Sequence, residues 1–216
     1  KDNRMFYIFW LWKAWNTIAG SVFGTMLLKL WGVRLHGIVK CVGLPRLEID
    51  PKGKVYVGRH VCLRSARCSN IAGVFQPVSI GTLDGGRIEL GDGCGISGST
   101  LVASREIRIG KNVLIGAGCR ILDCDFHPVS AEARIHGGKG KCAPVILEDG
   151  VWLAAGVTVL KGVTIGRNTV VGAGSVVVKP LPENVLAAGN PAKPIGVIRR
   201  KEPQIIQTKN NGSIQL

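Results

Sequence analysis

The sequence predicts a mainly β protein, a parallel β-solenoid preceded by an apolar helical segment. Three observations carry this prediction. An aliphatic residue recurs every six positions over most of the chain, glycine or asparagine recurs between these positions, and the stretch from Met5 to Trp31 is apolar and holds four of the five tryptophans. A period of six fits no α-helix, whose faces return every 3.6 residues, and strand alternation alone does not insert corners so regularly.

The clearest run of the repeat lies in the C-terminal half. Aliphatic residues follow one another there at steps of six: Leu147, Leu153, Val159, Ile165, Val171 and Val177. A second register of small or β-branched residues lies two positions earlier: Val145, Val151, Val157, Val163, Thr169 and Ser175. Three hexads that close a triangular coil would stack on the next coil and bury both registers in one core. A generic β-sandwich would not keep this register over six consecutive hexads.

The same repeat appears upstream with one irregularity. Leu90, Ile96 and Val102 keep the six-residue step, one extra residue intervenes, and Ile109, Ile115 and Ile121 resume it. Val57 and Leu63 predict an irregular first coil. The corners need residues that tolerate unusual φ angles, which glycine and asparagine supply at 110–112, 166–168 and 172–174.

The composition limits the classes of partner that this protein is expected to bind. The net charge is +14, from 28 Lys and Arg against 14 Asp and Glu, which suits a nucleotide-like cofactor or an acidic membrane surface. No nucleic-acid-binding module is recognisable, so nucleic acid is not an expected partner. The seven cysteines include no CxxC pair and predict reduced thiols in a cytosolic protein rather than a disulfide framework.

The apolar N-terminus leaves its role open. Lys13 and Lys29 interrupt it, and the 15 residues from Ala14 to Leu28 fall short of the roughly 20 that a spanning helix needs. One interpretation is an interfacial membrane anchor, and the other is helical packing on the main domain or across a subunit interface. The predicted organisation is an apolar helical segment at 1–35, a solenoid domain at 36–200 with a loop at 122–144, and a flexible tail at 201–216.

From about Val55 to Ile198 the chain resembles the hexapeptide-repeat acyltransferases, enzymes that share a left-handed parallel β-helix and include sugar, serine and xenobiotic O-acetyltransferases. Three stretches carry the resemblance beyond the repeat: the loop with His127-Pro128 between Ile121 and Val145, the segment VWLAAG at 151–156, and the closing stretch at 170–195 with its GNPAK. The sequence departs from the family pattern at Leu153-Ala154 and at Val178, which are backbone-contact positions in relatives.

The resemblance implies that His127 is the catalytic base. Acetyl transfer from a thioester requires the attacking hydroxyl to lose a proton, and an imidazole with a pKa near 6.5 suits that task. Asp125 is the preferred acceptor for the second ring nitrogen, and Asp123 is the alternative or a ligand for the acceptor's hydroxyls. The resemblance also places Trp152 beside the acyl site, and His136, as a second loop histidine, is a candidate residue near the acceptor.

The cofactor implied is acetyl-CoA. By resemblance, the backbone N–H of Ala155 would stabilise the oxyanion, and the pantetheine arm would bond the backbone near Ala155 and Ala173. Lys179 and Lys193 would meet the phosphates. No metal is expected, since γ-class carbonic anhydrases need three zinc histidines that this repeat does not place. In relatives the site lies between subunits, so the resemblance implies a homotrimer.

The predicted function is acetyl-CoA-dependent O-acetylation of a carbohydrate hydroxyl on a surface polysaccharide or glycan precursor. The expected location is the cytoplasm, with peripheral contact to the inner face of the membrane left open. Serine O-acetylation and amino-sugar N-acylation are the alternative reactions, and a non-catalytic β-helix scaffold is the alternative of a different class.

Overall fold

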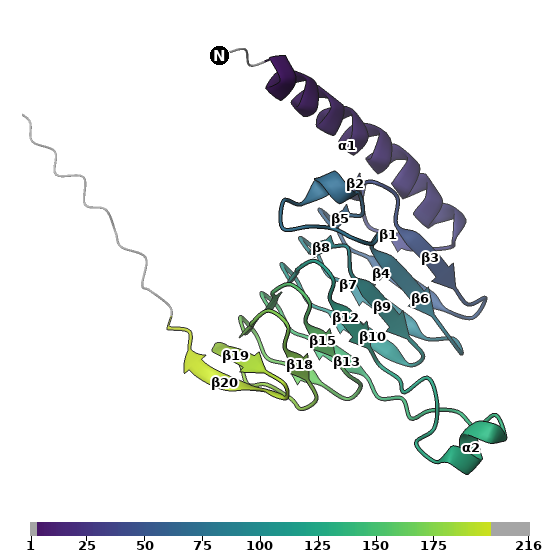
Figure 1. Cartoon of the computed structure of the whole chain (residues 1–216). Coiled ribbons are helices and arrows are strands. Elements are labelled where there is room, and N and C mark those ends of the chain that lie inside the picture. The colour runs from purple at the N-terminus through teal and green to yellow at the C-terminus, as the bar shows by residue number, and fades with distance from the viewer. Residues whose placement is uncertain (1–3, 200–216) are drawn as a thin grey trace, which may run out of the picture.

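The computed structural model describes residues 4–199 and shows a triangular β-helix with a long helix at its N-terminal end (Figure 1). The described strands visit three sheets in turn, so that successive triplets form stacked coils. Sheet A contains β1 (Arg34–Leu35), β4 (Lys54–Val57), β7 (Arg87–Leu90), β10 (Glu106–Ile109), β13 (Val145–Leu147) and β16 (Thr164–Ile165). Sheet B contains β2 (Lys40–Val42), β5 (Cys62–Arg64), β8 (Gly95–Ser97), β11 (Leu114–Ile115), β14 (Trp152–Leu153), β17 (Val170–Val171), β19 (Val185–Gly189) and β20 (Ala192–Val197). Sheet C contains β3 (Arg46–Ile49), β6 (Ser79–Thr82), β9 (Thr100–Ala103), β12 (Arg120–Leu122), β15 (Thr158–Val159) and β18 (Val176–Val177).

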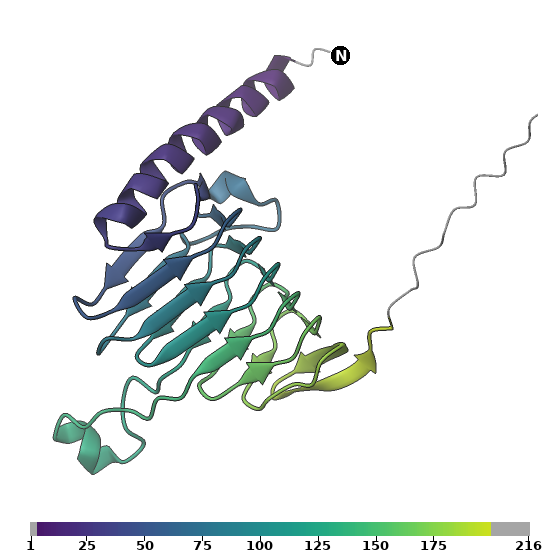
Figure 2. The same ribbon diagram turned by 180° about the vertical axis from the view of Figure 1, so that it is seen from behind.

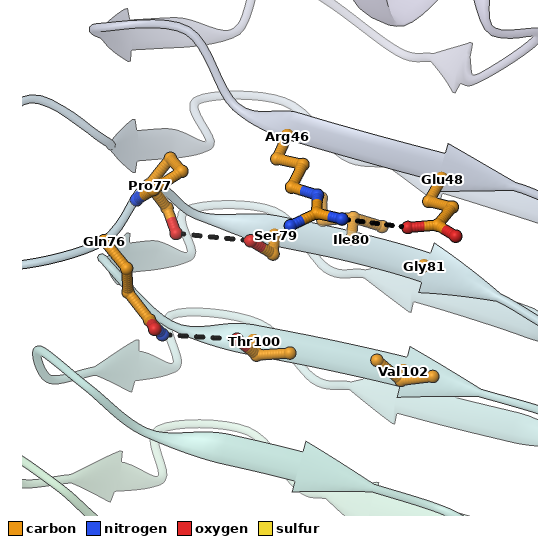
Figure 3. A pocket seen from close by; sticks show the side chains of 9 residues that line it. All are labelled: Arg46, Glu48, Gln76, Pro77, Ser79, Ile80, Gly81, Thr100 and Val102. Atoms are coloured by element: carbon orange, nitrogen blue, oxygen red, sulfur yellow. Dashed lines mark hydrogen bonds and ion pairs between the residues drawn. The ribbon is translucent and has the colours of Figure 1, made fainter.

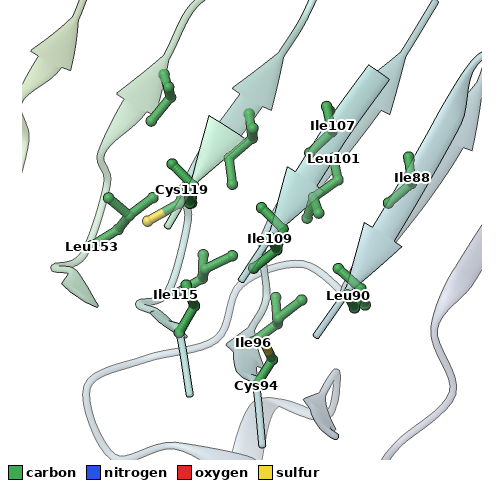
Figure 4. Close-up of a cluster of buried hydrophobic side chains, with 14 of the residues drawn as sticks. Ile88, Leu90, Cys94, Ile96, Leu101, Ile107, Ile109, Ile115, Cys119 and Leu153 are labelled. Carbon is green, nitrogen blue, oxygen red and sulfur yellow. The ribbon is translucent and has the colours of Figure 1, made fainter. Parts of the chain in front are cut away.

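The core of the β-helix is built from the two hexad registers that the sequence predicts. Their aliphatic side chains point inward and form one continuous buried cluster along the stack (Figure 4). Full burial of one Val, Leu or Ile side chain contributes about 1.5–3 kcal/mol. The two polar members of the run, Thr169 and Ser175, are also buried, and their hydroxyls donate to the carbonyls of Pro182 and Gly172, each at 2.7 Å. The predicted repeat is therefore confirmed except at Val102, which faces outward and is only half-buried, while its neighbours Leu101 and Ala103 occupy the core.

The corners also follow the prediction. Asn112 and Asn168 adopt φ angles of 54° and 57° at the corner between sheets A and B. Gly174, at the corner between sheets B and C, has a φ of 70°. Only residues that tolerate this left-handed region allow so short a turn between consecutive hexads.

The first coil begins at Arg34, before Val57, where the repeat predicts an irregular first coil. Strands β1 to β3 occupy residues 34–49, and Val39, Cys41 and Leu47 of this coil are buried. Its sequence lacks the regular step because one of its sides packs against a helix rather than against another coil. That helix is α1 (Arg4–Leu30), whose Leu28 is fully buried in the end of the core.

Helix α1 covers the open edge of sheet B. The Ser21 hydroxyl accepts the backbone N–H of Cys41 at 3.1 Å, and the Thr25 hydroxyl accepts that of Val39 at 3.3 Å. Gly20 and Gly24 bring the helix close, because a Cβ atom at either position would lie 2.6 Å from an atom of Cys41. An uncovered edge strand invites pairing with another chain, and α1 prevents that here.

The extra residue in the upstream repeat is explained by Asp123, and this corrects its predicted role. Asp123 is fully buried, and its two carboxylate oxygens accept the backbone N–H groups of Ser104, Arg105 and Glu106 at 2.6–2.7 Å. These residues form the widened corner between β9 and β10, where the coil is one residue longer. The carboxylate is thus committed to the backbone and is not available to an acceptor hydroxyl or to His127.

We predict that Asp123→Ala lowers the free energy of unfolding by about 2–4 kcal/mol, because three backbone donors lose their acceptor. Asp125→Ala is the matched control. It removes one ion pair between side chains that are each about a third exposed, so it should cost less than about 1 kcal/mol. Urea denaturation followed by circular dichroism measures both, and equal midpoints for the two variants would contradict the assignment.

Candidate active site

Two long segments interrupt the regular coils. One at residues 65–78 contains the 3-10 helix η1 (Arg67–Ser69), and the longer one carries the candidate site. It occupies residues 123–144, between β12 of sheet C and β13 of sheet A, and contains the short helix α2 (Ala131–Ile135). The two opposite views show the loop projecting from the body, away from β19 and β20 (Figures 1 and 2). A polar loop leaves the stack here because the corner between sheets C and A can open without disturbing the hexads on either side.

His127 lies exposed on the first arm of this loop. The next two residues are held in place by Arg134, whose guanidinium donates to the carbonyls of Pro128 at 3.0 Å and Val129 at 2.6 Å. Ser130 caps α2 by accepting the N–H of Ala133. The backbone beside His127 is therefore fixed by the loop itself, while the imidazole faces solvent.

The predicted contact between Asp125 and His127 is not present. The carboxylate of Asp125 accepts a hydrogen bond from Nζ of Lys161 at 2.6 Å instead. Lys161 lies at the next turn of the same corner and ties the base of the loop to the coil that follows. In the part of the chain that the structure describes, the imidazole of His127 makes no hydrogen bond.

His136 is exposed at the C-terminal end of α2, on the same loop as His127. The backbone N–H of His136 donates to carbonyls of α2, and its ring points to no described partner. The structure thus brings both predicted loop histidines into one projecting segment.

A second group of predicted residues lies at a different corner, between sheets B and C. Ala155 follows β14 and Ala173 follows β17, one coil further on, and the two turns are stacked by a hydrogen bond from Gly174 N–H to the Ala155 carbonyl at 2.9 Å. Both alanines are exposed. Within residues 4–199 the N–H groups of Ala155 and Ala173 donate to no protein acceptor. This corner therefore presents free backbone donors to solvent.

Trp152 and Lys193 belong to the same side of the molecule as these alanines. Trp152 lies on the outer face of sheet B, 49% exposed, in register with Leu114 and Val170. Lys193 pairs with Ala188 in the hairpin of β19 and β20, which extends sheet B toward the corner. An indole face, backbone donors and a cation thus lie along one edge of the prism.

Lys179 is not with this group. It follows β18 at the corner between sheets C and A, above Lys161 and on the side of the loop. The chain takes six residue steps from Ala155 to Lys161 and crosses the width of sheet C, up to about 20 Å at roughly 3.3 Å per step. Within one chain, the loop and the corner with Ala155 and Ala173 are therefore separated by a sheet.

Two residues of the site were not predicted from the sequence, Arg134 and Lys161. Each acts through a contact that depends on the folded loop, and neither occupies a distinctive position in the repeat. Lys161 gives no distinctive signal, because the equivalent corner positions of other hexads also hold a cation, as at Arg167 and Lys179.

The surface hollows include one over sheet C, which is not a better candidate for the active site. This hollow of about 330 Å³ is lined by both polar and apolar residues, with an exposed ion pair of Arg46 with Glu48 and a hydrogen bond from Gln76 to Thr100 (Figure 3). It holds no histidine or cysteine. Among the described residues, no three His, Cys, Asp or Glu side chains are grouped to hold a metal ion.

Comparison with known proteins agrees with this architecture. Residues 144–179 match the model of the bacterial transferase hexapeptide (six repeats), and residues 106–121 match the hexapeptide repeat of succinyl-transferase. A galactoside O-acetyltransferase of Lactococcus lactis is 39% identical over 128 residues, which is 59% of each protein. The chain spans about half the length of the curated relatives it matches.

Solved structures give the same result. A hexapeptide-repeat acetyltransferase of Vibrio cholerae, in complex with acetyl-coenzyme A, is 30% identical with a TM-score of 0.51, over 56% of this chain and 66% of that chain. An N-acyltransferase of Bacillus cereus shares the fold, with a TM-score of 0.64 at 18% identity over 81% of this chain and 88% of that chain. The predicted left-handed parallel β-helix is confirmed, and residues 106–121 and 144–179 carry the hexapeptide repeat of bacterial transferases.

Proposed function

We propose that this chain is an acetyl-CoA-dependent O-acetyltransferase that acts on a carbohydrate hydroxyl. The observation that carries the proposal is the exposed His127 on the loop at residues 123–144, which is inserted into a transferase hexapeptide repeat. The similarity to a galactoside O-acetyltransferase and to an acetyltransferase bound to acetyl-coenzyme A supports the acceptor and the donor, respectively.

In this proposal His127 acts as the general base. Its neutral imidazole accepts the proton of the attacking hydroxyl, and Arg134 positions it by holding the two carbonyls that follow. The free N–H of Ala155 donates to the thioester carbonyl oxygen as negative charge develops there. The free N–H of Ala173, the side chain of Lys193 and the indole of Trp152 lie along the same edge and suit a long, amide-rich and phosphorylated donor.

The active site is completed by a second copy of the chain. Because a sheet separates His127 from Ala155 within one chain, we infer that the loop of one copy meets the corner between sheets B and C of its neighbour. A closed ring of three copies would repeat this contact and form three sites. Lys179, on the loop side, would then approach the donor from the copy that supplies His127.

We predict that the intact chain binds acetyl-CoA saturably in a calorimetric titration, and that His127→Ala binds it as well. In a screen of galactosides, serine and amino-sugar nucleotides, acetyl transfer should occur to a sugar hydroxyl. His127→Ala should lower its kcat by about 10²–10⁴. His36→Ala, which alters an exposed histidine far from the loop, is the control. Absence of acetyl-CoA binding by the unaltered chain would refute the enzyme, and transfer to serine or to an amino group would refute the acceptor class.

A site formed by two copies of the chain leads to a separate prediction. Ala155→Pro removes the N–H, and proline is favoured at a turn position that precedes a glycine with positive φ, as Ala155 precedes Gly156 with its φ of 72°. The proline variant and His127→Ala should each be nearly inactive alone. When they are co-expressed with different tags and mixed trimers are purified, one of three sites regains both groups, giving about a third of the unaltered activity. Mixed oligomers that stay inactive would place the whole site within one chain.

We also propose that helix α1 docks on an anionic membrane surface. The C-terminal part of the helix packs on sheet B through Ser21 and Thr25, whereas large apolar side chains are exposed along the whole helix: Tyr7, Ile8, Trp10, Leu11, Trp12, Trp15, Ile18, Val22, Phe23, Met26 and Leu30. The helix contains no acidic residue, and the chain carries a net charge of +14. No helix in the described part of the chain has the length and hydropathy to cross a bilayer, so the contact proposed is peripheral.

The side of the membrane follows from the thiols. All seven cysteines are free, as in a reducing compartment, so the proposed location is the cytoplasmic face. An acceptor held on a lipid carrier would meet the enzyme there.

We predict that the intact chain floats with vesicles of phosphatidylserine and phosphatidylcholine, and that flotation falls as salt rises. The double variant Trp15→Asp with Val22→Asp should stay at the bottom of the gradient, because two exposed apolar contacts become anionic. Ile195→Asp, an equally exposed change on β20, should float normally. If the double variant floats as before but changes its mass in light scattering, α1 contacts another copy and the membrane proposal is wrong.

A further inference from the structure

Two cysteines face each other at the base of the loop. Cys124 and Cys142 form an isolated antiparallel bridge that joins its two arms. The flanking hydrogen bonds run from Asp125 N–H to the Lys141 carbonyl at 2.9 Å and from Ala143 N–H to the Asp123 carbonyl at 2.8 Å. This pattern makes the cysteines a non-hydrogen-bonded pair, in which side chains project to the same face and Cα atoms lie about 4.5 Å apart. Disulfides span Cα distances of about 4.4–6.8 Å.

Both thiols also reach the same space. Cys124 and Cys142 line one hollow of about 290 Å³ under the loop, together with Phe126 and Lys139. Cys142 is exposed, whereas Cys124 is only 8% exposed. Burial raises the pKa of the Cys124 thiol, so the exposed Cys142 is the sulfur that a reagent reaches first.

The remaining cysteines do not offer such a pair. Cys41, Cys94 and Cys119 are buried in the core. Cys41 and Cys62 lie on adjacent strands, but the register pairs Cys41 with Leu63 and leaves Cys62 on the opposite face of the sheet. In the strand pairings of residues 4–199, Cys124 and Cys142 alone are set opposite each other.

We propose that Cys124 and Cys142 form a redox-active dithiol site, which small disulfides such as oxidised glutathione convert reversibly to an intramolecular disulfide. The Cys142 thiolate attacks one sulfur of the small disulfide, giving a mixed disulfide and releasing one thiolate. The Cys124 thiolate then attacks Sγ of Cys142 and expels the second thiolate. Both cysteine protons are released, the two cysteines are oxidised, and the small disulfide is reduced to two thiols.

The disulfide closes a covalent ring around the loop that carries His127, Arg134 and His136. In the dithiol form the two arms of the loop can separate at the bridge between Cys124 and Cys142, whereas in the disulfide form they cannot. The consequence for acetyl transfer rests on the proposed function, but the chemistry of the dithiol does not. A mass measurement therefore tests the site whether or not the chain proves to be an acetyltransferase.

The experiment uses the full chain, reduced and then equilibrated in native buffer with mixtures of reduced and oxidised glutathione. After alkylation and digestion, mass spectrometry should find the peptides of Cys124 and Cys142 joined, lighter by two hydrogen atoms, and separated again by dithiothreitol. Cys142→Ser should abolish the link, and Cys124→Ser should hold glutathione on Cys142. Cys68→Ser, a partly exposed cysteine outside the loop, should change nothing.

Other results would overturn the proposal. A stable glutathione adduct on Cys142 of the unaltered chain, without transfer to Cys124, would show that the two thiols do not meet. A link that forms only in urea would show that it belongs to the unfolded chain. The exposed Cys142→Ser variant and the unaltered chain decide both points even if replacement of the buried Cys124 impairs folding.

Discussion

The stacking of inward aliphatic side chains is the constraint on which the rest of this molecule depends. Each coil places its hexad residues directly on those of the coils above and below, as the in-register pairing of β7, β10 and β13 illustrates. A strand that slipped by one residue would turn its buried side chains outward, so the register is held strongly. Because the register is held, the corners are held too, and turn residues from successive coils form columns along the three edges of the prism.

The candidate chemistry lies where this regularity is relaxed. The coil that gains a residue before Glu106 widens its corner, and Asp123 fills it with a buried carboxylate. Directly after Asp123 the chain leaves the stack in the loop that carries His127. One residue thus closes the irregular corner of one coil and anchors the loop that follows it. Lys161, on the coil that follows the loop, also anchors the loop, because its ammonium group pairs with the carboxylate of Asp125.

The two ends of a β-helix need a cover, because their strands have no further coil to pair with. At the N-terminal end, hydroxyls of α1 bond the edge of sheet B, and glycines allow the helix to lie close. At the other end, β20 folds back antiparallel on β19. The N-terminal cover leaves large apolar side chains of α1 exposed, which is why the same helix serves both as a cap for the core and as the proposed contact with lipid.

The sequence by itself determined the solenoid, its turns and its core apart from Leu101 and Ala103, because burial at fixed steps of six leaves a periodic record in residue type. It also located the loop, since a break in that period is as visible as the period. Only the tertiary structure decided what individual polar residues do. Asp123 bonds the backbone of another coil, Asp125 pairs with Lys161, and Cys124 meets Cys142 across the loop. Such contacts join residues far apart in the chain, so no local sequence pattern predicts them. The structure likewise decided that Ala155 and His127 occupy different corners, because the order of sheets around the prism is a property of the folded coil.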